Sequence, residues 1–183
     1  TSEQISVDTG KIHVVIPKQG HAIIRSVERQ GKQILAEAKL VCIREEKTQL
    51  SSACVRKEVD FESILDNVSV ERSGALRIVV LAEGRHRAVE GEESWLPFRI
   101  RMVFYRHQDS IRFTHTFLYD GDAQKDFIKG IGISFQVPLS SPLYNRHVRL
   151  AGDSGYFSES PKNLATSRTT GIYAELHKQQ QAG

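Results

Sequence analysis

Arginine is concentrated in the middle of the chain in a pattern that suggests a surface for binding anions. Between positions 85 and 112 the sequence has six arginines and no lysine: Arg85, Arg87, Arg99, Arg101, Arg106 and Arg112. A guanidinium group holds a carboxylate through two parallel hydrogen bonds, a geometry that a lysine ammonium does not offer. The same stretch contains Trp95, whose ring is large enough to stack against a sugar. The pattern therefore favours a site for an anionic sugar.

We assign six residues to this candidate site. The candidates for substrate binding are Arg85, Arg99, Arg101, Tyr105 and Trp95, and the candidate for catalysis is His86. His86 lies where a predicted strand opens into a long connection, which is a suitable place for a titrating imidazole. The alternative is a solvated sheet face on which these arginines pair with Glu90, Glu92, Glu93 or other neighbours.

The elements that must carry these side chains are β-strands. Residues 98–105 alternate, with Phe98, Ile100, Met102 and Phe104 on one face and Arg99, Arg101 and Tyr105 on the other. Residues 76–82 are apolar on both faces, which is typical of a strand in the middle of a sheet. Residues 54–61 are dense in charge, which favours a sheet edge. Residues 84–97 form a connection that is too long for a hairpin turn.

The same two-residue period runs through most of the chain. It predicts strands over 11–16, 22–28, 33–35, 40–44, 54–61, 68–72, 76–83, 98–105, 111–118, 127–137, 146–151 and 172–176. No stretch of ten residues shows helical periodicity, so we expect an all-β antiparallel sandwich almost without helix. The predicted core is Ile78, Val80, Phe98, Ile100, Phe104, Phe113, Phe117, Ile133 and Phe135. Small residues on the other face of 127–137 suggest close packing there.

Length and composition limit the possible classes of protein. The 183 residues suit one domain over 1–177, followed by a frayed tail or cut end at 178–183. A net charge of +3 does not indicate nucleic-acid binding, and no apolar run is long enough to cross a membrane. The first residues lack a signal-peptide pattern, and we expect the signal upstream of this chain, in a secreted or periplasmic protein.

The two cysteines and the remaining motifs add little chemistry. Cys42 and Cys54 are symmetric about Thr48, so a hairpin closing there would place them opposite each other, either bonded or as two free thiols. Two cysteines and isolated histidines do not make a metal site, and we expect neither a metal nor another cofactor. His115, between Phe113 and Phe117, is interpreted as a core histidine.

An ordered set of short motifs resembles a known family. The set comprises Asp8–Gly10 before 12–15, the hairpin 29–35, residues 70–77 leading to 83–86, residues 96–101, His115–Phe117, and Gly121–Asp122 before 131–133. In this order they resemble the central β-sandwich domain of the exo-rhamnogalacturonan-lyase-like, or YetA-like, proteins. The resemblance covers the chain to about residue 160.

The resemblance implies more than the residues show. It implies a supersandwich fold like that of polysaccharide lyases and galactose-mutarotase-like proteins, of which 183 residues is a short, incomplete copy. It also implies a small β-barrel domain before this one and an α/α toroid after it. Such proteins cleave uronate-containing, rhamnogalacturonan-type glycans of pectin by β-elimination.

Two hypotheses follow for this chain. In the first, it contributes binding of an acidic oligosaccharide to a polysaccharide lyase (a carbon–oxygen lyase), and it is inactive alone. In the second, it is a non-catalytic carbohydrate-binding or scaffold domain. The first expects the region of Arg85 and His86 and the face of Arg99 and Arg101 to converge on one groove. The second expects these groups to point apart or to be neutralised by pairing.

Overall fold

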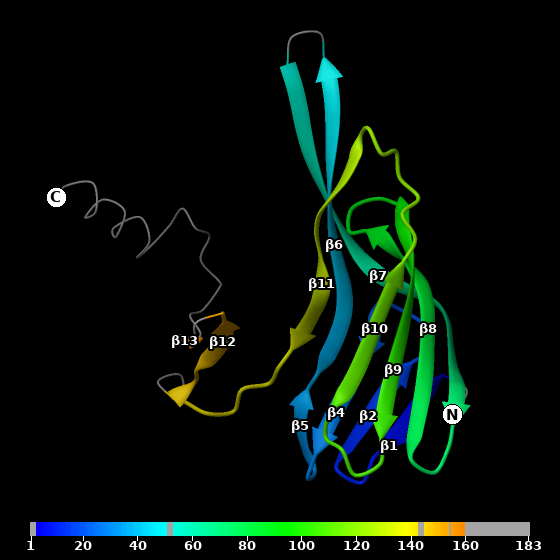
Figure 1. Ribbon diagram of the computed structural model, residues 1–183, viewed down its shortest axis with the longest axis vertical. Helices are drawn as coiled ribbons and strands as arrows, with labels where there is room; N and C mark the ends of the chain where they lie inside the picture. The colour runs from blue at the N-terminus through cyan, green and yellow to red at the C-terminus, as the bar shows by residue number, and fades with distance from the viewer. Residues whose placement is uncertain (1–2, 51–52, 143–144, 154, 160–183) are drawn as a thin grey trace, which may run out of the picture. The chain divides into compact units, whose positions relative to one another are not determined.

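The computed structural model of the protein describes residues 3–50, 53–142, 145–153 and 155–159, and these residues form strands and no α-helix. One sheet has the order β1-β2-β4-β5, formed by β1 (Gln4–Asp8), β2 (Ile12–Pro17), β4 (Ser26–Arg29) and β5 (Lys32–Leu35). A larger sheet has the order β10-β9-β8-β7-β6-β11 (Figure 1), formed by β6 (Glu37–Leu50), β7 (Ala53–Ser73), β8 (Arg77–Ala88), β9 (Ser94–Tyr105), β10 (Ile111–Phe117) and β11 (Asp126–Gln136). Its seventh strand, β3 (Ala22–Ile24), pairs with β6.

The chain divides into two compact units, Thr1–Pro138 and Leu139–Gly183. Both large sheets belong to the first unit. The second contains the hairpin of β12 (Val148–Gly152) and β13 (Gly155–Glu159), close to its predicted position. The predicted strand at 172–176 and tail at 178–183 lie outside the described residues, so the single domain over 1–177 stays a prediction. No helix among the described residues is long and apolar enough to cross a membrane.

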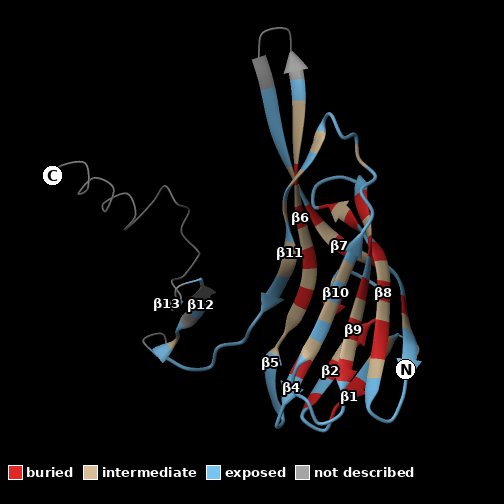
Figure 2. Ribbon diagram, viewed as in Figure 1, coloured by how far each residue is buried: buried red, intermediate tan, exposed pale blue. Residues whose placement is uncertain are grey.

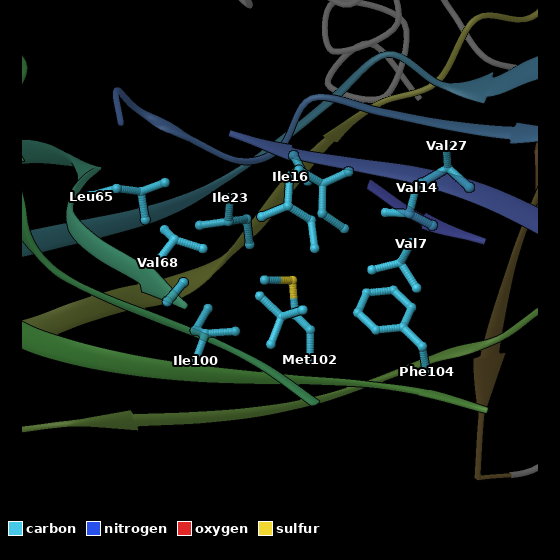
Figure 3. Packing of buried hydrophobic residues seen from close by; sticks show 14 of the residues in the cluster. Val7, Val14, Ile16, Ile23, Val27, Leu65, Val68, Ile100, Met102 and Phe104 are labelled. Carbon is cyan, nitrogen blue, oxygen red and sulfur yellow. The ribbon is translucent and has the colours of Figure 1, made fainter. Parts of the chain in front are cut away.

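The two sheets of the first unit enclose one main apolar core. Val14 and Ile16 of the small sheet point toward Ile100, Met102 and Phe104 of the large sheet (Figure 3), and all five are buried. Alternation places these side chains inward and leaves the arginines of β9 on the opposite face. The predicted antiparallel, all-β sandwich is therefore confirmed.

The β6–β7 hairpin is much longer than expected, and this overturns the predicted cysteine pairing. Leu50 lies opposite Ala53, so the hairpin closes beyond the predicted centre at Thr48. Cys42 pairs with Phe61, whereas Cys54 pairs with Gln49. Seven residues of an extended strand separate the two cysteine levels, roughly 23 Å at about 3.3 Å per residue, which no disulfide spans. Cys42 is a buried free thiol, and burial raises its pKa to about 11.

One expectation about these segments is confirmed and another is wrong. Residues 54–61 belong to β7 and pair with β6, but β8 pairs with β7 only from Phe61 onward, so most of this charged stretch has one side unpaired among the described residues, as predicted. Residues 84–97 are mostly strand, because β8 continues to Ala88 and β9 begins at Ser94. Their charged residues are compatible with strands because every second side chain points outward. The predicted long functional loop is thus a short turn around Gly91, which has a positive φ of 101°.

The predicted core is correct at the centre of the large sheet and wrong at its edges. Val80, Phe98, Ile100 and Phe104 are buried, and Ile78, Phe113 and Ile133 are half-buried against the core. Phe117 in β10 and Phe135 in β11 are 40% and 49% exposed. Figure 2 shows these two outer strands mainly in tan and pale blue. On the other face of β11, a Cβ at Gly130 would lie 3.6 Å from the Ile43 side chain, whereas Gly132 has open space around it, so a neighbour packs at Gly130 and not at Gly132.

The contrast between centre and edge gives a paired stability test. Phe104→Ala removes a buried ring and should cost about 3–5 kcal/mol of unfolding free energy. Phe117→Ala removes a ring that is already 40% exposed and should cost less than about half of that. Urea denaturation of both variants measures the difference. Equal losses would show that the inner face of β10 is covered as fully as that of β9.

Candidate functional site

The predicted arginines lie on the outward face of the large sheet, and each has a carboxylate partner from this chain. Arg99 Nε donates to Glu83 Oε1 over 2.7 Å, and Arg101 donates from Nε and Nη2 to the Glu71 carboxylate over 2.9–3.1 Å. Arg85 Nε lies 3.7 Å from Asp66 Oδ2. The predicted alternative of a paired sheet face therefore describes these side chains, although the partners come from β7 and β8 and not from the turn.

The predicted site residues do not line a single groove. Arg85 and Arg99 border one pocket of about 500 Å³ together with Asp66 and Glu83. Arg101 borders a separate pocket on the same face. Tyr105 is 37% exposed and borders a third. The structure thus brings two of the arginines together, with two carboxylates beside them, and leaves Arg101 and Tyr105 elsewhere.

His86 lies in the interior of the protein, which corrects its predicted placement beside an open loop. Its side chain is fully buried, and its Nδ1–H donates to the Leu96 carbonyl oxygen over 2.8 Å. Its Nε2 has no hydrogen-bond partner among the described residues, and the ring packs edge-on against Phe98. Burial lowers the pKa of His86, and its hydrogen bonds with the backbone of Leu96 and Trp95 oppose this shift only in part. In this arrangement the imidazole does not reach a substrate on the outward face.

The backbone around His86 is held in an unusual conformation. Leu96 is buried and has a positive φ of 46°, which non-glycine residues rarely adopt. Its carbonyl accepts from His86, and its N–H donates to Asp120 Oδ1 over 2.9 Å. The ladder between β8 and β9 shifts register next to it, between Gly84 and His86. His86 therefore has a structural role, since it holds this irregular turn of β9 in place.

Trp95 is only 3% exposed, so its ring does not form the predicted platform for a sugar. It packs against Phe61 and Tyr119, with ring centroids 5.7 and 6.1 Å apart. The guanidinium carbon of Arg44 lies 5.3 Å from the Trp95 ring centroid and 5.1 Å from that of Phe61. These contacts make Trp95 part of a second apolar cluster with Phe61 and Leu96.

The sequence analysis did not identify Arg44, a buried charged side chain with several carboxylate neighbours. It is buried on the inward face of β6 and donates to both oxygens of Glu93, over 2.6 and 2.8 Å. Glu46 accepts a further hydrogen bond, and Asp126 Oδ1 lies 3.7 Å from Nε. Burial opposes the charge of Arg44, but Glu93, Glu46 and Asp126 outweigh it and raise the pKa. The two-residue period of the strand could have revealed its burial, because Arg44 follows Leu40 and Cys42 at positions that face inward.

Comparison with known proteins gives two matches. The family model described as "PcRGLX-like protein central beta sandwich domain" matches residues 1–183. The "Uncharacterized protein YetA" of Bacillus subtilis (strain 168) is 36% identical over 179 residues, which is 98% of this chain and 21% of that protein. The chain thus spans about a fifth of the length of the curated relative it matches.

Removal of Arg44 should destabilise the protein far more than removal of an exposed arginine. Arg44→Ala breaks a buried ion pair and should cost about 3 kcal/mol or more of unfolding free energy. The matched control is Arg56→Ala, whose side chain is 66% exposed and 3.9 Å from Glu45, with an expected cost below about 1 kcal/mol. Equal costs in urea denaturation would refute a stabilising role for the Arg44 cluster.

His86, which is buried, and His115, which is half-buried, should make the protein acid-sensitive. Burial lowers the pKa of His86 and of His115, and the neighbouring His86 lowers that of His115 further. Below the ordinary value of 6.5 the unfolded chain therefore binds protons that the folded chain does not. Stability should fall as the pH falls through this value. Urea midpoints at about pH 7.5 and about pH 5.5 should differ less in His115→Gln than in the unaltered chain or in the exposed control His13→Gln. An identical pH dependence in all three proteins would contradict this.

Proposed function

The chain belongs to the family of PcRGLX-like central β-sandwich domains, and we propose that it is a structural domain of a longer protein that cleaves acidic glycans by β-elimination. In this proposal the longer protein is a polysaccharide lyase of the rhamnogalacturonan-lyase type. This domain provides a framework for the catalytic parts and no catalytic group of its own. Of the two hypotheses from the sequence, the proposal adopts the scaffold.

One observation carries the proposal: the side chains assigned to chemistry are already engaged within this chain. β-Elimination on a uronate needs a group that neutralises the carboxylate, a base for the adjacent proton and an acid for the leaving oxygen. Arg85, Arg99 and Arg101 have carboxylate partners, and His86 and Trp95 are buried. A substrate carboxylate would therefore compete with these partners for the three guanidinium groups.

The two outer strands of the large sheet support a scaffolding role. Phe117 lies opposite Phe98, and Ile131 and Phe135 lie opposite Cys42 and Ala38, so all three share the inward face of buried residues. Yet each is at least 38% exposed, because the small sheet covers the centre and not the edges. Apolar side chains aimed at an interior but left uncovered mark an interaction surface. In the proposal, other parts of the longer protein cover them.

A second function, weak substrate binding, is favoured by one feature of the outward face. Arg85 and Arg99 border the same pocket, and Pro97 and Leu118 also line it. An acidic oligosaccharide could compete there with Asp66 and Glu83 for the guanidinium groups. Such exposed contacts weaken as salt rises, so binding of this kind is recognisable by its salt dependence.

Turnover measurements test the proposed function. The chain alone, incubated with a uronate-containing oligosaccharide, should form no unsaturated product, measured by ultraviolet absorbance. In the longer protein, Arg99→Ala should keep turnover within about twofold, because its exposed ion pair contributes little to stability. Product formation by the isolated chain would refute the proposal. So would a loss of turnover of about a hundredfold in Arg99→Ala at an unchanged melting temperature, because it would place Arg99 in the active site.

A further inference from the structure

The outward face of the large sheet carries a second pocket with a different balance of charge. This pocket, of about 600 Å³, is lined by Glu71, Arg72, Arg77, Val79, Arg101 and Val103. Its three guanidinium groups and one carboxylate give a net charge of +2. The pocket that Arg85 and Arg99 border has two guanidinium groups and two carboxylates, and hence no net charge. An anion is therefore attracted more strongly to the first pocket.

A β-bulge in β7 brings these arginines together. Val70 lies opposite Val80, but the register shifts and Arg72, not Glu71, lies opposite Val79. Without the shift Arg72 would lie opposite Ile78, whose side chain packs against the core. Bulges re-aim side chains in this way and are common beside functional sites. The bulge thus turns Arg72 to the face that Val79 and Val103 share, where Arg77 and Arg101 also lie.

Two of the three arginines are available to a ligand. Arg101 is held by both oxygens of Glu71. Arg72 and Arg77 are exposed, and neither forms an ion pair with any residue that the structure describes. Arg112, exposed on the neighbouring strand opposite Val103, adds a fourth guanidinium beside the pocket. The pKa of Glu71 is lowered by Arg101 first, with further contributions from Arg72 and Arg99, which is the response expected of a carboxylate in a positive field.

From this arrangement we infer that the pocket formed by Arg72, Arg77 and Arg101 is a binding site for a carboxylate-bearing oligosaccharide. Arg72 and Arg77 each have a guanidinium group that is free to hold a carboxylate through two hydrogen bonds. Val103, which is half-buried, adds apolar surface for the C–H face of a sugar ring, whereas Val79 beside it is only 6% exposed. Tyr105 lies opposite Arg77 on the same face and is 37% exposed, so its ring can stack on a neighbouring sugar.

This inference is independent of the scaffold proposal, because it requires binding and no chemistry at this face. The inferred anion site is the pocket of Arg72, Arg77 and Arg101, and not the region of Arg85 and His86 that the sequence pattern favoured. Of the earlier candidates it retains Arg101 and Tyr105, and it adds Arg72 and Arg77. A domain of this kind would hold an acidic chain whether or not catalysis takes place elsewhere in a longer protein.

Titration calorimetry with trigalacturonate tests the inference at two salt concentrations. The double variant Arg72→Ala/Arg77→Ala should weaken binding by at least about tenfold, the effect of losing one hydrogen bond between charged groups, and should flatten the salt dependence. The matched control is Arg29→Ala/Arg56→Ala, which removes the same charge from exposed positions outside both pockets and should stay within about twofold. All four side chains are half-exposed or fully exposed, so both variants should keep the melting temperature of the unaltered chain.

Three results would overturn the inference. One is the absence of binding by the unaltered chain at low salt. Another is equal weakening by the two double variants, which would show attraction by net charge without a site. The third is equal affinity for the uncharged trisaccharide maltotriose, which would show that the carboxylates are not recognised. If a short single-stranded DNA bound as tightly as trigalacturonate, recognition would be of polyanions in general, and the sugar assignment would also be wrong.

Discussion

The second apolar cluster of the sandwich, around Phe61 and Trp95, depends on the ion pairs of the buried Arg44 guanidinium. A cation inside a protein is stable only if opposite charges and hydrogen bonds replace the water it has lost. Glu93 from the β8–β9 turn, Glu46 from β6 and Asp126 from the start of β11 supply these charges. The same group packs over the rings of Phe61 and Trp95. One side chain of β6 therefore contacts residues of β7, β9 and β11 and of the β8–β9 turn.

The functional consequence is a separation between the two faces of the large sheet. Its inward face contains the buried cation, the two histidines and the apolar core, and these groups are used for stability. Its outward face carries arginines, most of them matched by carboxylates on neighbouring strands. Beside the bulge after Val70, Arg72 and Arg77 are exposed and form no ion pair with any described residue, so positive charge remains unpaired there. A framework domain with one anion-binding pocket is the account that fits both faces.

The sequence was informative where local pattern decides the structure and misleading where distant contacts decide it. Alternation in residues 98–105 correctly separated the buried Phe98, Ile100 and Phe104 from the outward arginines. It could not show that Phe117 and Phe135 lie at uncovered edges, because strand order depends on pairing across the whole chain. The turn at Gly91 was not recognised, because the residues around it are mostly charged. The symmetry of Cys42 and Cys54 about Thr48 predicted a register that the β6–β7 ladder does not adopt. Burial of Trp95 and His86 depends on contacts with residues far away in the chain, such as Phe61 and His115, which no motif marks.

Hydrogen exchange on the two outer strands tests the central claim, that this domain is a framework whose edges are covered by other parts of a longer protein. In the isolated chain, amides of β10 and β11 that do not pair with β9 or β6 should exchange quickly, and those of β8 and β9 slowly. In the longer protein the free amides of β10 and β11 should be slowed by at least about tenfold, because contacts there protect the edges, while β8 and β9 stay unchanged. Identical exchange of β10 and β11 in the two proteins would contradict the account.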